Sequence, residues 1–319
     1  MELSEDELTA AIARVLSGAG PEVIVGPGDD AAVLAAGGGE LVLTADALIE
    51  GVHFDLGITS ARDLGYKAIV VSVSDIAAMG ASPRAALVTL ALRADLGAAW
   101  VIELYGGMRE ACSEHALWLV GGDLSRADQV AISVTVTGEV APGRAVTRAG
   151  GSPGDLIAVT GALGASAAGL RVARGGRVRG ELDRALLHAH ARPVARVGEG
   201  AVLARHGATA MMDVSDGLAI DLGRLVRASE AGARLRLGDV PVADGATLED
   251  ALGGGEDYEL LVALPGIESL EAAAAELREA YGAPLAAIGE IVAGEGVTAV
   301  DPAGAERPLE PEGWDHFRP

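Results

Sequence analysis

Seven aspartates of this chain stand at or just beyond short apolar runs, where a carboxylate would lie at the end of a buried element. They are Asp29, Asp30, Asp46, Asp75, Asp123, Asp213 and Asp216. A carboxylate removed from water costs free energy unless a positive charge compensates it, and Lys67 is the one lysine of the chain. Hard oxygen ligands without a His/Cys cluster suit Mg²⁺, which usually binds together with phosphates. The aspartates therefore predict phosphate chemistry assisted by metal ions rather than by basic side chains.

Glycine-rich or hydroxyl-bearing segments accompany several of these aspartates. Thr44 precedes Asp46 at the end of a predicted strand, where a hydroxyl can complete a Mg²⁺ shell. The sequences GGDLS (121–125) and GGGEDYEL (253–260) place glycines before carboxylates. Glycine there lets backbone N–H groups approach a phosphate. Three consecutive glycines lose much conformational entropy on folding, which disfavours a purely structural role for the second sequence.

Two of the motifs also have plain structural interpretations. GPGDDAAVL (26–34) reads as a tight turn, and Asp and Gly are common in turns of any function. DVSDGL (213–218) reads as strand, turn and helix start. Ser215 or Asp216 could simply cap that helix, and the helix N-terminus could equally bind a phosphate. A lone histidine such as His53 is more often structural than catalytic.

Composition excludes several classes of function. The net charge of −22 argues against a nucleic-acid or anionic-membrane surface, because both require clustered Lys and Arg. Cys112 is the single cysteine, so we expect a reducing compartment and no disulfide framework. The acidic N-terminus does not resemble a signal peptide. The longest charge-free run, 156–170, is shorter than the ~20 residues of a membrane span. We expect a soluble, cytoplasmic protein.

The elements that must position the aspartates alternate between strands and helices, which predicts α/β units in both halves of the chain. The segment 61–79 is ambiguous, but its boundary signals favour a helix with Lys67, Val71 and Asp75 on one face. The Gly- and Pro-rich stretch 141–155 predicts a boundary between domains 1–140 and 141–319. The other predicted helices are 5–17, 97–115, 181–190, 194–206, 217–230 and 267–281, and the predicted strands are 40–46, 84–93, 116–121, 129–140, 155–161, 209–214, 233–237, 257–264 and 285–291.

Familiar phosphate-binding and hydrolytic motifs are absent. The sequence has no GxxxxGK[ST], no GxGxxG opening a helix after a strand, no CxxC and no HExxH. A kinase is still possible, but it must bind nucleotide through metal ions held by acidic residues.

Taken together, the strings GDDAAV, TAD…GVHF, SDIAAMGA, GGDLS, TRAGGSPGD…VTG, DVSDGL, GGGEDYEL and WDHF resemble bacterial thiamine-monophosphate kinases over nearly the whole chain. The strings GGGEDYEL and WDHF are the specific part. GDDAAV and SDIAAMGA are shared with aminoimidazole ribonucleotide synthetase, selenophosphate synthetase and a hydrogenase-maturation protein. The resemblance implies transfer of the γ-phosphoryl group of ATP to thiamine monophosphate, with ATP as co-substrate, several Mg²⁺ ions, and direct in-line attack by an already ionised phosphate.

The resemblance also implies two α/β domains, with the amino-terminal domains pairing in a homodimer through a shared barrel-like sheet. It implies site residues of three kinds. The metal ligands would be Asp30, Thr44, the Ala45 carbonyl, Asp46, Asp75, Asp123, Asp213 and Asp216; the ATP contacts Gly122, Asp123, Arg148, Ser215 and Tyr105; the substrate contacts His53, Glu256 and Trp314. Trp314 could place a π face on the thiazolium cation, or simply anchor the C-terminus.

Three positions depart from the family pattern. Ala45 stands where a Thr or Ser precedes the aspartate, Leu124 stands where GGDT is usual, and Ser72 stands where Asn is frequent. None of these changes removes a carboxylate. Two alternatives stay open: another ATP-dependent synthetase of the same superfamily, and a non-catalytic relative that binds metal or nucleotide. The mid-chain position of Cys112 disfavours a selenophosphate synthetase, which usually needs a reactive Cys near its N-terminus.

Overall fold

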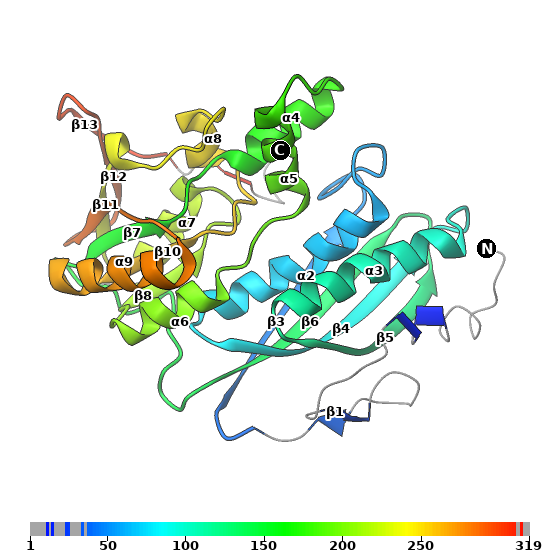
Figure 1. The fold of residues 1–319 in the computed structure, drawn as a ribbon. Coiled ribbons are helices and arrows are strands. Elements are labelled where there is room, and N and C mark those ends of the chain that lie inside the picture. The colour runs from blue at the N-terminus through cyan, green and yellow to red at the C-terminus, as the bar shows by residue number, and fades with distance from the viewer. Residues whose placement is uncertain are drawn as a thin grey trace. The chain divides into compact units, whose positions relative to one another are not determined.

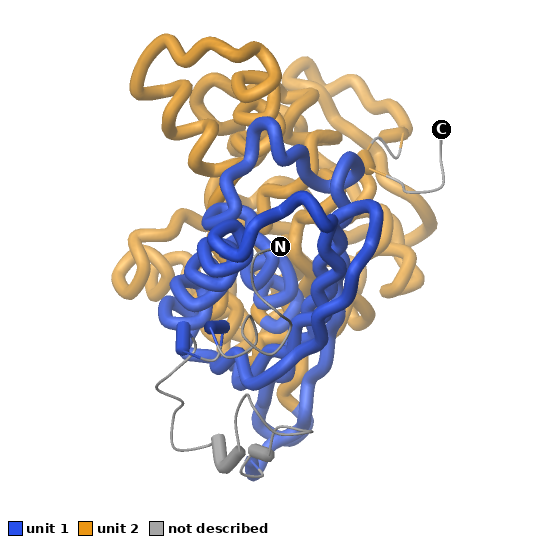
Figure 2. The backbone as a smooth tube through the Cα atoms, turned by 90° about the vertical axis from the view of Figure 1, so that its right-hand side faces the viewer, with its two compact units in different colours: residues 1–76, 82–143 blue, residues 77–81, 144–319 orange. Residues whose placement is uncertain are grey.

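The protein is represented by a computed structural model that describes residues 11, 12, 14, 15, 23–25, 33, 34, 37–310, 313 and 314. It is a mixed α/β structure of two compact units, drawn in Figures 1 and 2. Unit 1 comprises Met1–Ile76 and Ser82–Gly143, and unit 2 comprises Ala77–Ala81 and Arg144–Pro319. The division at Gly143 falls within the Gly- and Pro-rich stretch 141–155.

Unit 1 is built on a four-stranded sheet with the order β3-β6-β4-β5. Its strands are β3 (Glu40–Ile49), β4 (Ser82–Leu92), β5 (Trp118–Arg126) and β6 (Ala131–Val140). β6 pairs antiparallel with β3 and β4, whereas β4 and β5 are parallel. Buried and half-buried residues alternate along β6, as expected of a strand covered on one face. Two short strands, β1 (Val23–Val25) and β2 (Val33–Leu34), pair separately.

Helices α2 (Ala61–Ala78) and α3 (Ala98–Glu114) lie on one face of this sheet (Figure 1). Nearly every residue of α2 after Asp63 is buried, so its sequence has no polar stripe and resembles a buried strand. The predicted helix is nevertheless confirmed. The two helices approach closely at glycines: a Cβ at Gly65 would lie 1.9 Å from the Leu104 carbonyl oxygen, and one at Gly107 would lie 1.8 Å from that of Arg62.

Unit 2 contains a seven-stranded sheet with the order β13-β12-β9-β11-β7-β10-β8. The pair β12/β9 is parallel and the other pairs are antiparallel. The strands are β7 (Leu156–Thr160), β8 (Ala210–Asp213), β9 (Gly232–Arg236), β10 (Leu260–Leu264), β11 (Leu285–Val292), β12 (Gly296–Val300) and β13 (Glu306–Pro308).

The described helices of unit 2 are α4 (Ala165–Gly175), α5 (Glu181–Ala191), α6 (Val197–Arg205), α7 (Leu218–Ala228), α8 (Leu248–Gly253) and α9 (Ile267–Tyr281), with a 3₁₀ turn at Leu237–Asp239. Helices α7 and α8 share one hydrophobic core with the sheet, and α6 and α9 share the other. All five residues of β10 are buried. Leu261 belongs to a core shared with α7, and Val262 belongs to a core shared with α6 and α9. A strand buried on both faces loses the polar alternation of a one-sided strand.

Several predicted elements differ from the structure. β3 continues to Ile49, three residues beyond its predicted end, and β5 continues to Arg126. β10 begins at Leu260 rather than at residue 257, and α8, β12 and β13 were not predicted. Most of the predicted helix 5–17 lies outside the described residues, as do Asp29 and Asp30.

The described strands form open sheets, and none of them closes into a barrel. The shared barrel was predicted for two paired chains, so it stays a prediction. Within the ranges that the structure describes, no helix is both long and apolar enough to cross a membrane.

Candidate functional site

In unit 1 the structure brings Thr44, Asp46 and Asp75 together. Thr44 and Asp46 are two residues apart on β3, so their side chains share one face of the strand. The Thr44 Oγ1 donates to Asp75 Oδ2 of α2 across 2.5 Å. The Ser72 Oγ, one turn earlier on the same helix, donates to Asp46 Oδ2 across 2.7 Å. Ala45 lies between the two polar residues, and its side chain therefore projects from the opposite face of the strand.

This pair of carboxylates fits a hard cation. The pKa of Asp46 is raised, first because burial disfavours its charge and then because the Asp75 carboxylate lies nearby; the Ser72 hydrogen bond acts in the other direction. Adjacent, partly buried carboxylates favour a bound cation, which would relieve both effects. Among the described residues no three His, Cys, Asp or Glu side chains form a cluster able to hold a metal. Mg²⁺ commonly takes only one or two protein carboxylates and completes its shell with phosphates and water.

The sequence predicted that Asp123 stands at the end of a strand, and the structure shows that it does not. It lies inside β5, opposite Thr89 of β4, because β5 continues past it. Burial, followed by the charge of Asp123, raises the pKa of Tyr105 to about 12, so that phenol stays neutral. Gly122 has a packing role beside this carboxylate: a Cβ there would lie 1.9 Å from the Val88 carbonyl oxygen.

His53 has a structural hydrogen bond in this unit. The backbone N–H of Ile49 donates to the ring nitrogen Nδ1 of His53 across 2.9 Å, and the backbone N–H of His53 donates to the Ile49 carbonyl. A ring nitrogen that accepts a hydrogen bond carries no proton, so a neutral His53 ring has its proton on Nε2. Cys112 is buried in α3, and burial raises the pKa of its thiol to about 12. A thiol protonated at neutral pH is a poor nucleophile, which argues against a reactive-cysteine synthetase.

In unit 2 the turn after β8 is held by an aspartate that the sequence analysis missed. The carboxylate of Asp221, fully buried in the first turn of α7, accepts the N–H groups of Ser215 and Asp216 at 3.1 and 2.9 Å. The predicted cap by Ser215 or Asp216 is wrong, because α7 begins after Gly217 and neither of their side chains caps it. Burial raises the pKa of Asp221 to about 6. An Asp four residues past the DG of a strand–turn–helix motif was the available signal.

The two aspartates of this motif differ in their surroundings. Asp213, the last residue of β8, is buried. Asp216 forms an ion pair with Arg224, which also contacts Asp221 Oδ1 at 2.8 Å. The guanidinium therefore already neutralises part of the charge that was predicted to bind metal.

Three segments far apart in the sequence meet at this turn. The Glu256 N–H donates to the Ser215 carbonyl across 2.7 Å, and the Trp314 N–H donates to the Asp216 carbonyl across 3.0 Å. Gly255 is required by the contact, because a Cβ there would lie 2.7 Å from the Ser215 carbonyl oxygen. The Trp314 residue is 48% exposed. The structure thus brings together three of the predicted contacts, namely Ser215, Glu256 and Trp314.

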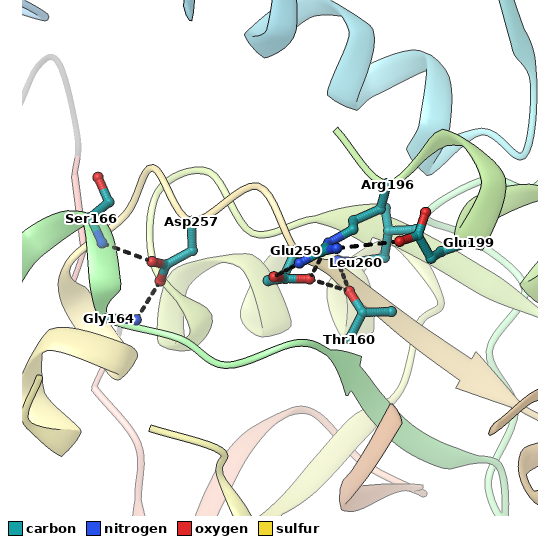
Figure 3. A network of polar contacts seen from close by, with 8 residues as sticks. All are labelled: Thr160, Gly164, Ser166, Arg196, Glu199, Asp257, Glu259 and Leu260. Atoms are coloured by element: carbon teal, nitrogen blue, oxygen red, sulfur yellow. Dashed lines mark hydrogen bonds and ion pairs between the residues drawn. The ribbon is translucent and has the colours of Figure 1, made fainter. Parts of the chain in front are cut away.

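Two further carboxylates, Asp257 and Glu259, make hydrogen bonds in the segment that follows Glu256 in the sequence, and Figure 3 shows these bonds. Asp257 accepts the N–H groups of Gly164 at 2.7 Å and Ser166 at 3.3 Å, at the start of α4. Burial raises its pKa to about 7 despite these bonds. Glu259 accepts two hydrogen bonds from the Arg196 guanidinium, at 2.8 and 2.5 Å, and one from the Thr160 hydroxyl at 2.6 Å.

Arg148, predicted to contact ATP, lies in the segment that precedes β7. Its residue is exposed, and its carbonyl accepts a hydrogen bond from the Ser229 hydroxyl at 3.1 Å. The predicted residues therefore fall into two groups, each described within its own unit. Unit 1 contains His53, Thr44, Ala45, Asp46, Asp75, Tyr105, Gly122 and Asp123, and unit 2 contains Arg148, Asp213, Ser215, Asp216, Glu256 and Trp314.

The chain matches two models of known protein families. Residues 28–140 match the N-terminal domain of AIR synthase related proteins, and residues 152–302 match the C-terminal domain. Among curated proteins, thiamine-monophosphate kinase of Escherichia coli K12 is 38% identical over 311 residues, covering 93% of each chain. The Bacillus subtilis thiamine-monophosphate kinase is 39% identical over 250 residues, covering 75% of this chain and 77% of the relative.

Solved structures of thiamine-monophosphate kinases are also similar to this chain. A thiamine-monophosphate kinase from Stenotrophomonas maltophilia is 34% identical with a TM-score of 0.81, covering 94% of this chain and 97% of its own. A structure described as AaThiL complexed with AMPPCP and TMP is 34% identical with a TM-score of 0.78, covering 99% and 98%. The hydrogenase maturation protein HypE in complex with ATP, at 22% identity and a TM-score of 0.79 over 97% and 94% of the chains, shares the fold.

Proposed function

Because this chain belongs to the thiamine-monophosphate kinase family and is an enzyme, we propose that it phosphorylates thiamine monophosphate with ATP, giving thiamine diphosphate and ADP. The observation that carries this proposal is the structural similarity of this chain, over 99% of its length, to a relative complexed with AMPPCP and TMP. The local geometry supports it, since the family motifs DVSDGL, GGGEDYEL and the Trp314 segment converge on one turn. The reaction would be the last step in the formation of thiamine diphosphate.

The acceptor needs no general base. A phosphate monoester has a second pKa of ~6 and is therefore largely ionised at neutral pH. A phosphate oxygen of thiamine monophosphate attacks the γ-phosphorus of ATP as the bond to the β-phosphate oxygen breaks, with the two oxygens in line. The reaction is a direct transfer without a phosphoenzyme. The problem left to the protein is to bring two anions together, and this makes charge neutralisation the main requirement.

Asp46 and Asp75 are the best-supported metal ligands, with Thr44 orienting Asp75. Their all-oxygen donor set and their proximity suit Mg²⁺. Bound Mg²⁺ would neutralise phosphate charge and align the reacting oxygens. Further metal contacts are proposed for Asp123, Asp213, Asp216, Asp30 and the Ala45 carbonyl on the family pattern. Arg224 weakens the case for Asp216, because it already pairs with that carboxylate.

The nucleotide and substrate contacts are proposed on the same basis. Gly122, Asp123, Arg148, Ser215 and Tyr105 would contact ATP. Trp314, which is half exposed, would stack on the thiazolium cation, a contact typically worth ~0.5–2 kcal/mol. The Glu256 carboxylate would accept hydrogen bonds from the aminopyrimidine. The role of His53 must leave its Nδ1 bonded to Ile49 and use the other ring nitrogen.

A homodimer is proposed through the sheet of unit 1. Leu41 and Leu43 on β3 are 65% and 62% exposed, and Leu87 on β4 is 45% exposed. Alternation places Leu41, Leu43 and Ala45 on the face of β3 opposite to Asp46. Exposed apolar side chains on one sheet face mark a surface that another chain can cover. Light scattering at micromolar concentration should give twice the 32.0 kDa chain mass.

The proposed function is tested by ADP release from MgATP with thiamine monophosphate, thiamine or formylglycinamidine ribonucleotide as acceptor. Thiamine diphosphate formed only from the monophosphate supports the kinase. ADP formed only with the amidine would assign the chain to another synthetase of the superfamily. No turnover with any acceptor, despite MgATP binding, would favour a non-catalytic relative.

A further inference from the structure

The loop that presents Glu256 has an unusual backbone, fixed from several sides. Glu256 and Tyr258 have φ values of 59° and 53°, in the left-handed region that residues other than glycine seldom adopt. Such conformations are strained and persist where the surroundings over-determine them. Here the surroundings are explicit: the N–H groups of these two residues bond the carbonyls of Ser215 and Val214 at 2.7 and 2.9 Å. The backbone of Glu256 is thus set before a ligand binds.

The side chain of Glu256 contacts a histidine of helix α5, and that histidine contacts helix α4. His190 Nδ1, near the end of α5, lies 3.4 Å from Glu256 Oε2. The same nitrogen lies 3.0 Å from Ser166 Oγ in the first turn of α4. A carboxylate only accepts hydrogen bonds, so the contact with Glu256 is favourable when Nδ1 carries a proton. Ser166 is itself fixed, because its N–H donates to Asp257, the neighbour of Glu256.

This Ser–His–Glu arrangement is not a hydrolytic triad. In a triad the two ring nitrogens have separate partners, one bonding the nucleophile and the other the carboxylate. Here the hydroxyl and the carboxylate both contact Nδ1, so the ring cannot relay a proton from one to the other. The geometry serves to orient the carboxylate.

We propose that His190, supported by Ser166, is a positioning residue that fixes the Glu256 carboxylate for recognition of the amino-bearing pyrimidine ring of the substrate. This inference rests on the proposed function. A glutamate side chain has several rotatable bonds, and ordering it on binding costs conformational entropy. The contact with His190 orders it in advance. Loss of the contact therefore weakens binding of thiamine monophosphate and leaves ATP and the chemical step unaffected.

Steady-state kinetics of His190→Ala test the proposal. We expect the KM for thiamine monophosphate to rise about tenfold, as for loss of a polar contact with a charged group, with kcat and the KM for ATP within about twofold of wild type. His190→Asn should recover most of the loss, because its amide can donate from near the Nδ1 position. His188→Ala is the matched control, since His188 is exposed on the same helix. A mere packing defect would lower the melting temperature and would not be rescued selectively.

A double-mutant cycle with Glu256→Ala supplies the decisive measurement. If His190 acts through Glu256, His190→Ala has no further effect on the KM for thiamine monophosphate once Glu256 is alanine. Additive effects, or an unchanged KM in His190→Ala, would overturn the proposal while wild-type turnover still upheld the kinase. Wild-type enzyme without turnover would instead contradict the proposed function. If His190→Ala fails to fold, Ser166→Ala replaces it in the same cycle, with an expected rise of about threefold.

Discussion

The Thr44 hydroxyl donates to the Asp75 carboxylate across 2.5 Å, and this bond links strand β3 to helix α2. The two residues are 31 positions apart in the chain. The Asp46 carboxylate of the same strand lies close enough to Asp75 for the two charges to interact. A strand and a buried helix thus hold the acidic pair rigidly, as a site that must align two phosphates requires.

Asp75→Asn is expected to lower kcat by at least about 10²-fold with the fold intact, because it removes half of the charge that balances the metal. Asp123→Asn should behave in the same way. The measurement is ADP release at saturating MgATP, with circular dichroism to verify folding. Asp128→Asn is the control, as Asp128 is exposed in the turn after β5. Wild-type turnover by Asp75→Asn would refute the shared-metal mechanism.

Ala45→Ser is expected to leave kcat within about twofold of wild type. The family pattern suggested that Ala45 lacks a hydroxyl ligand, but strand alternation projects its side chain away from Thr44 and Asp46. A serine hydroxyl would therefore not reach the acidic pair. Thr44→Val is the comparison, since it removes the hydroxyl that does bond Asp75. A large gain in turnover by Ala45→Ser would show that the residue faces the metal after all.

Sequence reasoning succeeded where a pattern is local and failed where tertiary contacts decide. Boundary signals identified α2 although its burial hides any helical stripe. They could not show that β5 continues past Asp123, because the strand is extended by pairing with β4 through an irregular register. The short strands β12 and β13 are stabilised by pairing with neighbouring strands, and local sequence propensity does not predict them.

The candidate site shows the same limit. The motif residues Ser215, Glu256 and Trp314 could be selected from the sequence, and the structure shows that the first two and the Trp314 backbone meet. His190 could not, because it belongs to no motif, and Asp221 was missed although it lies four residues past the DG of DVSDGL. Each acts through a contact with another segment. His190 contacts Glu256, which lies 66 residues later in the chain (256 − 190), and the Asp221 carboxylate in α7 accepts a hydrogen bond from the turn before that helix.

Gly122→Ala is expected to destabilise the protein by about 1–3 kcal/mol, since the new Cβ would lie 1.9 Å from the Val88 carbonyl oxygen and force the strands apart. Urea unfolding measures the change. Gly223→Ala is the contrast: apart from its chain neighbours and the adjacent backbone of α7, no described atom lies within 4 Å of its Cβ position, and alanine is favoured over glycine in helices by about 1 kcal/mol. Equal behaviour of the two variants would show that the close contact is not the reason for Gly122.

Asp257 should give stability a measurable pH dependence. Its folded pKa of about 7 lies above the value near 4 of an unfolded aspartate. Between these values the folded protein binds a proton that the unfolded chain releases, so the stability contributed by this group is lost as pH rises. The free energy of unfolding of wild type relative to Asp257→Asn should therefore fall between pH 4 and 7. A constant difference across that range would mean that the carboxyl ionises normally.

Arg196→Met is expected to destabilise the protein by roughly 3 kcal/mol, because it leaves the Glu259 carboxylate buried without its partner. The side chains of this pair are 23% and 8% exposed, and two hydrogen bonds join them. The matched control is Arg205→Met in helix α6, whose pair with Glu276 is 59% and 41% exposed. Exposed pairs contribute only about 0–1 kcal/mol.

Adding Glu259→Gln to Arg196→Met should restore part of the loss. The neutral amide no longer places an uncompensated charge in the interior, and its oxygen can still accept the hydrogen bond that Thr160 donates at 2.6 Å. Urea unfolding of the two single variants and the double variant therefore separates the cost of a buried charge from the value of the ion pair. A double variant less stable than Arg196→Met would show instead that Glu259 has favourable contacts beyond Arg196 that require its negative charge.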